Sequence, residues 1–119
     1  LRETLVIEGS GQIVTATLLE LDLVAVLDVS GVVTSGNLVA IMRATRLALA
    51  GRCTLFLEIR LHRALLALSR LSLPKILPGI AAEAPVGIPG AFFVSEADSD
   101  FAVHLVWGLA MYGVERVVS

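Results

Sequence analysis

The sequence predicts an α/β fold in which helices pack on a mixed sheet of about five to six strands, with an N-terminal antiparallel hairpin and then a parallel portion. First, a glycine-containing turn separates two β-prone runs, residues 1–7 and 12–19. Second, an amphipathic segment of crossover length joins two nearly unbroken aliphatic runs, residues 23–29 and 53–59. Third, residues 90–119 show the pattern strand, helix, strand.

The composition limits the class of protein. A chain of 119 residues suits a single α/β domain over residues 1–119 with its own core. Hydrophobic residues make up 56% and charged residues 17%, so we expect some apolar surface to meet another subunit or a ligand. A net charge of -2 without a Lys/Arg cluster argues against nucleic-acid binding. One cysteine, no transmembrane segment and no visible signal peptide favour a cytoplasmic protein.

The first half of the chain is expected to form the hairpin, an inner strand and a helix. Residues 23–29 (LVAVLDV) are aliphatic enough for a strand buried on both faces, and Ser30-Gly31 is interpreted as the turn that ends it. Thr34 or Ser35 can cap a helix over residues 36–50. The residues of its inner face recur at helical spacing: Leu38, Ile41, Met42, Thr45 and Leu49.

The middle of the chain is predicted to contain the central strand and a second helix. The central strand is residues 53–59 (CTLFLEI), and Cys53 at its start is interpreted as a buried structural thiol. Leucines at helical spacing predict a helix over residues 60–71. Pro74 and Pro78 interrupt that pattern, and a short helix over residues 75–82 is left open. Prolines and glycines over residues 85–90 predict a loop after it, and the structure of residues 72–90 as a whole is not predicted.

The last unit begins with an apolar strand at residues 91–94. Ser95 and Asp98 then have the spacing of a helix N-terminus, where a hydroxyl and a carboxylate satisfy free backbone N–H groups. A helix with apolar positions at helical spacing follows, and Gly113 can end it. The valines that follow predict a final strand: Val114, Val117 and Val118.

This order of elements resembles the STAS-like family, the small bacterial relatives of anti-sigma-factor antagonist domains. The similar phrases are residues 29–34 (VSGVVT) before the first helix, residues 55–60 (LFLEIR) at the central strand, and residues 92–113 in the last unit. The resemblance implies a regulatory or protein-interaction module. Anti-sigma-factor antagonists carry a phosphorylatable serine after the central strand, but residues 60–65 (RLHRAL) contain no Ser or Thr. A kinase-driven switch is therefore not expected.

Ligands of open α/β sheets gather at the carboxyl ends of the parallel strands. On the predicted assignment, those ends bring together a candidate site for a ligand or anion: Ser30, Arg60, His62, Arg63, Ser95 and Asp98. Two simpler interpretations compete with this site, because Ser95 and Asp98 can be helix caps and the arginines can be solvated. His62 has no His, Cys or acidic partner at metal-ligand spacing. No set of catalytic, cofactor-binding or metal-binding residues emerges, so we expect no enzyme.

The sequence supports two hypotheses for function. The first is a non-catalytic interaction module, expected to be a homodimer, that binds a regulatory protein partner. Its candidate interface is Trp107 and Met111, which lie one helical turn apart beside Gly108 and Ala110. The second is an α/β domain that binds a small apolar molecule or a lipid in a pocket between the sheet and the helices.

Overall fold

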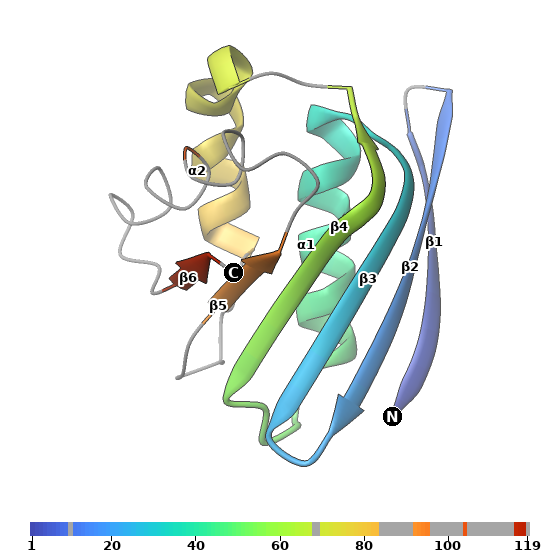
Figure 1. The fold of residues 1–119 in the computed structure, drawn as a ribbon, viewed down its shortest axis with the longest axis vertical. Coiled ribbons are helices and arrows are strands. Elements are labelled where there is room, and N and C mark those ends of the chain that lie inside the picture. The colour runs from blue at the N-terminus through green and yellow to red at the C-terminus, as the bar shows by residue number, and fades with distance from the viewer. Residues whose placement is uncertain (10, 68–69, 84–91, 96–103, 105–115, 119) are drawn as a thin grey trace.

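The structure is a computed structural model, and it describes residues 1–9, 11–67, 70–83, 92–95, 104 and 116–118. Its strands form one mixed sheet in which the spatial order follows the chain (Figure 1). The strands are β1 (Arg2–Gly9), β2 (Gln12–Leu21), β3 (Val24–Val33), β4 (Phe56–Leu66), β5 (Phe92–Ser95) and β6 (Arg116–Val118). Strands β1 to β3 pair antiparallel, and the pairs from β3 to β6 are parallel. The predicted fold class and N-terminal hairpin are confirmed.

Two α-helices pack on the same face of this sheet (Figure 1). Helix α1 (Ser35–Ala48) is the crossover between β3 and β4, which are adjacent and parallel as predicted. Helix α2 (Leu73–Glu83) follows a 3-10 turn at Arg70–Ser72 and lies against α1. Strand pairing and helix packing together place a single core between the sheet and the helix pair.

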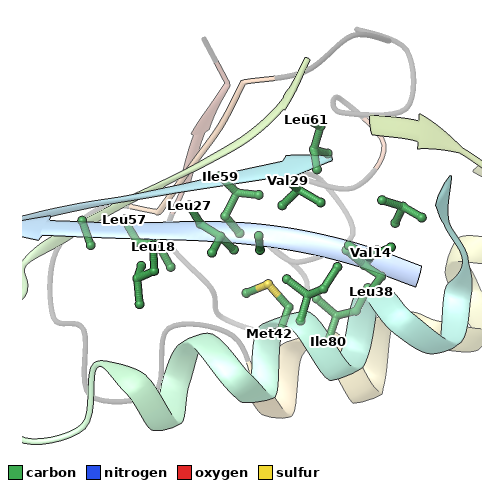
Figure 2. Packing of buried hydrophobic residues seen from close by; sticks show 14 of the residues in the cluster. Val14, Leu18, Leu27, Val29, Leu38, Met42, Leu57, Ile59, Leu61 and Ile80 are labelled. Carbon is green, nitrogen blue, oxygen red and sulfur yellow. The ribbon is translucent and has the colours of Figure 1, made fainter. Parts of the chain in front are cut away.

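The core follows the two-residue alternation of the strands (Figure 2). In β2, β3 and β4, every second residue points to the helices and is almost completely buried: Val14, Ala16, Leu18, Ala25, Leu27, Val29, Leu57, Ile59 and Leu61. The helices add Leu38, Ile41 and Met42 from α1, with Leu73, Leu77 and Ile80 from α2. Burial of each large aliphatic side chain contributes about 1.5–3 kcal/mol, so this layer accounts for most of the stability.

Helix α1 begins as the sequence predicts. Thr34 is its N-cap, and its hydroxyl accepts from the Asn37 backbone N–H at 3.3 Å. The Asn37 side chain returns the interaction by accepting from the Thr34 N–H at 2.7 Å. This reciprocal capping box satisfies two backbone donors that the first turn leaves free. The predicted inner face is also confirmed, because all five of its residues are buried.

The helix predicted over residues 60–71 is wrong. Strand β4 runs from Phe56 to Leu66, and its pairing with β3 continues to the end of both strands. Leu61 and Leu65 have helical spacing, but so short an apolar run suits either element. Hydrogen bonding to the neighbouring strand decides the outcome, and the segment's own sequence does not encode that pairing. The central strand also begins later than predicted, and Cys53 is exposed rather than buried.

The turn predicted at Ser30-Gly31 is wrong as well, since β3 continues through both residues. Ser30 pairs with Thr15 of β2, and Gly31 pairs with Val14. Gly31 has φ +107, and a Cβ at this position would lie 2.7 Å from the carbonyl oxygen of Ile13. The glycine therefore allows two strands to approach closely inside the sheet.

Helix α2 confirms and extends the short helix left open at residues 75–82. Pro74 lies in its first turn, where no backbone donor is needed, whereas Pro78 lies inside the helix and removes one hydrogen bond. The buried face of Leu73, Leu77 and Ile80 compensates for that loss. Strands β5 and β6 confirm the two strands of the last unit. The helix predicted between them lies outside the described residues.

Candidate functional site

The candidate site lies on the face of the sheet opposite α1 and α2, which we call the open face. The alternation that buries the aliphatic residues of β2, β3 and β4 directs their neighbours to this side. One row of paired residues crosses it, from Thr17 through Asp28 to Arg60. Within the described part of the chain, neither α-helix covers this row (Figure 1). The two described helices therefore leave this row open to a ligand or a partner.

A β-bulge in β4 brings two arginines to the open face. Asp28 pairs with Arg60, but two residues later Ser30 pairs with Arg63, so β4 advances by one residue more than β3. The extra residue reverses the alternation of β4. Arg60 and Arg63 would point to opposite faces of a regular strand because they are three residues apart. In this sheet both are exposed and line the same hollow.

This open-face hollow has a volume of about 270 Å³. Seven residues from four strands line it: Arg2, Thr17, Leu19, Val26, Asp28, Arg60 and Arg63. Three of them are arginines, and Asp28 is the one carboxylate in the lining. Leu19 and Val26 form an apolar patch beside the charges. The hollow can therefore hold an anionic group that is attached to an apolar stem.

The arginines are held differently. Arg60 donates from Nε to a carboxylate oxygen of Glu58, which lies two residues earlier in β4. That hydrogen bond, the charge of Glu58 and then the charge of Asp28 raise the pKa of Arg60 above its ordinary value. Among the described residues, Arg2 and Arg63 form no ion pair. Their guanidinium groups keep their donors for an anion, while Glu58 fixes the position of Arg60.

The predicted site residues are distributed differently from the sequence prediction. Arg60 and Arg63 do come together, but inside β4 on the open face and not at strand ends. Ser30 lies beside Arg63 in register, and its Oγ donates to the Thr15 carbonyl at 3.3 Å. The backbone of Ser95 pairs with Arg60. His62 lies within β4, and its side chain belongs to the part that is not described.

Three further predicted residues lie outside the described part of the chain: Asp98, Trp107 and Met111. Sequence reasoning missed Arg2 and Thr17 as site residues. The sequence signal for these two residues is the two-residue alternation of β1 and β2. Once the pairing of the strands is known, this alternation places Arg2 and Thr17 on the open face. The bulge that adds Arg63 has no comparable signal in the sequence.

Within the described ranges, no group of three or more His, Cys, Asp or Glu residues is placed to hold a metal ion. None of the described helices is both long and apolar enough to cross a membrane. No protein-family model matches the chain, and no curated protein matches it.

Proposed function

We propose that this chain is a non-catalytic interaction module, STAS-like in type, that binds an acidic segment of a regulatory protein partner in the open-face hollow. The observation that carries the proposal is the convergence of Arg2, Arg60 and Arg63 from two strands at opposite sides of the hollow. Two of these guanidinium groups have no ion-pair partner among the described residues. Such groups favour carboxylates, which accept two parallel hydrogen bonds from one guanidinium.

The dimensions and the lining of the hollow favour a peptide segment as the ligand. A volume of about 270 Å³ is small for a cofactor but holds one or two side chains. Leu19 and Val26 offer apolar contact beside the arginines, which suits acidic residues next to aliphatic ones. The net charge of -2 makes a nucleic-acid backbone a poor partner for the chain as a whole. A peptide with acidic and aliphatic residues supplies both the negative charge that the arginines favour and the apolar contact that Leu19 and Val26 offer.

Two further parts of the proposal rest on the sequence. The module is proposed to act in the cytoplasm, because a single cysteine suits a reducing compartment. Regulation is proposed to run through partner binding without phosphorylation, since the serine phrase of anti-sigma-factor antagonists is missing. The second hypothesis, an apolar-ligand pocket, stays a prediction, and no specific observation favours it. The described residues between the sheet and the helices are closely packed.

Fluorescence polarisation with labelled peptides tests this function. The probes are three peptides of equal length in which leucine alternates with glutamate, glutamine or lysine. We expect the chain to prefer the glutamate peptide, with an affinity that falls as salt is added. Arg63→Gln should weaken that binding about tenfold, since it removes charge-assisted hydrogen bonds.

Arg43→Gln is the matched control, because it removes an exposed arginine on the helix-covered side of the molecule. Its peptide affinity should equal that of the parent. Equal binding of the glutamate and glutamine peptides by the parent would contradict the proposal. An equal loss of affinity in Arg43→Gln and Arg63→Gln would do so too, since binding would then follow total charge and not the hollow.

A further inference from the structure

We propose that two copies of this chain associate through the free edge of β1, so that their sheets join antiparallel into one continuous sheet. This inference goes beyond the proposed function and does not rest on it. It concerns the edge of the sheet, and Arg2 is the one residue that both the edge and the hollow use. Strand β1 is the first in the spatial order, and among the described strands none pairs with its other side. Its outward backbone groups are therefore available for another strand.

The pairing with β2 identifies those outward groups. The Leu1 nitrogen donates to the Glu20 carbonyl at 3.0 Å, and the Glu20 N–H donates to the Leu1 carbonyl at 2.8 Å. Leu1 and Glu20 thus form a hydrogen-bonded pair, and bonding alternates along an antiparallel ladder. The regular register then directs the odd-numbered backbone groups of β1 toward β2. The groups that face outward are those of Arg2, Thr4, Val6 and Glu8.

Strand β1 lacks three of the features that usually prevent pairing at an edge, although it carries the charged residues Arg2, Glu3 and Glu8. It contains no proline and no lysine, and its eight residues pair with β2 without a bulge. Its sequence, RETLVIEG, is rich in β-prone residues. Val6 is 67% exposed on the open face, while Leu5 and Ile7 are half-buried at the border of the core. A second β1 would cover these apolar side chains.

The sequence of β1 is complementary to itself in one antiparallel register. When Leu5 lies opposite Leu5 of the second copy, Arg2 lies opposite Glu8 and Thr4 opposite Val6. The outward N–H and C=O groups of the two strands then face one another. The Arg2–Glu8 pair and the Thr4–Val6 pair each exchange two backbone hydrogen bonds, and both pairs occur once on each side of the two-fold axis. The side chain of Arg2 also lies opposite that of Glu8 in both of these pairs, which brings opposite charges together. A shift by two residues keeps the hydrogen-bonding pattern but separates Arg2 from Glu8.

This surface differs from the Trp107 and Met111 interface that the sequence suggests. The full chain and its variants can be compared by light scattering after size-exclusion chromatography, with circular dichroism as the test of folding. We expect a dimer for the parent. Val6→Pro should give a folded monomer, because the Val6 N–H faces outward and its loss costs no bond to β2. The matched control, Val6→Thr, keeps that N–H and should remain a dimer.

Charge reversal tests the register independently. Arg2→Glu or Glu8→Arg places like charges opposite each other twice and should weaken the dimer about tenfold or more. The double variant, with both changes, restores opposite charges and should recover the parent's association. A parent that is monomeric at high micromolar concentration would overturn the inference. A dimer that persists in Val6→Pro, or one that is lost when Trp107 is replaced, would also overturn it. The same holds if the double variant associates no more strongly than the single variants.

Discussion

The two faces of the sheet are built from the same strands but carry different kinds of residue. Toward the helices, β2, β3 and β4 present the aliphatic side chains of the core, which are almost completely buried (Figure 2). Toward the open face the same strands present Thr17, Asp28, Glu58 and Arg60. Burial fixes the first set by packing, whereas solvent leaves the second set free to serve recognition. One face therefore provides stability, and the other provides the candidate site.

The largest effect should come from placing a charge on the covered face. Leu57 is 1% exposed near the start of β4, so Leu57→Asp loses its burial and adds a desolvation cost. Together these cost about 4 kcal/mol or more, a large part of the stability of a small domain. We expect no folded protein in a thermal melt followed by circular dichroism.

A second leucine of the same strand supplies the control. Leu65 is 67% exposed, so Leu65→Asp should leave a cooperative melt. Similar melting temperatures for Leu57→Asp and the parent would show that the two faces do not differ as described.

The second effect concerns the close contact between β2 and β3. Gly31→Ala puts a Cβ 2.7 Å from the Ile13 carbonyl oxygen, in a backbone conformation with φ +107 that favours glycine. We expect a loss in the free energy of unfolding of more than about 2 kcal/mol, measured with urea.

Gly11→Ala is the matched control. Its φ is +75, but nothing lies within 4 Å of the added atom, so it should lose about 1–2 kcal/mol from backbone strain alone. If Gly31→Ala costs no more than Gly11→Ala, the strands do not approach each other as closely as described.

Local signals explain which parts of the fold the sequence predicts. The hairpin, helix α1 and its Thr34 cap depend on residues that are close in the chain, and all three are confirmed. The end of β4 and the course of β3 through Gly31 depend on pairing with other strands, and both predictions fail there. Of all the predicted features, the candidate site depends most on strand pairing. Arg60 and Arg63 share one face because of a bulge that only the paired sheet reveals.

A smaller effect on stability is expected at the helix pair behind the sheet. Glu83 of α2 binds Arg43 at 3.0 Å and Arg46 at 2.9 Å. Hydrogen bonds from Arg43 and then from Arg46 lower the pKa of the Glu83 carboxyl. A lowered pKa in the folded state stabilises the protein above the unfolded-state pKa, and this contribution disappears as the pH falls through the folded-state value.

Glu83→Gln should therefore be less stable than the parent at neutral pH. The difference in the free energy of unfolding should begin to shrink on acidification below about pH 4, the ordinary range of a glutamate carboxyl, and it should disappear as the pH falls through the lowered pKa of the folded state. Urea denaturation at neutral and acidic pH measures both values. A difference that stays constant across this range would mean that the ion pairs do not stabilise the folded state.

The central claim is that recognition belongs to the open face, and backbone NMR tests it most directly. The ¹⁵N-labelled chain is titrated with the alternating glutamate–leucine peptide. We predict that amide signals of Thr17, Asp28, Arg60 and Arg63 shift together and saturate at one affinity, while those of α1 and α2 stay in place. Arg63→Gln should reduce these shifts at the same peptide concentration without changing the melting temperature. Shifts centred on α1 or α2, or no saturating shifts at all, would contradict the account.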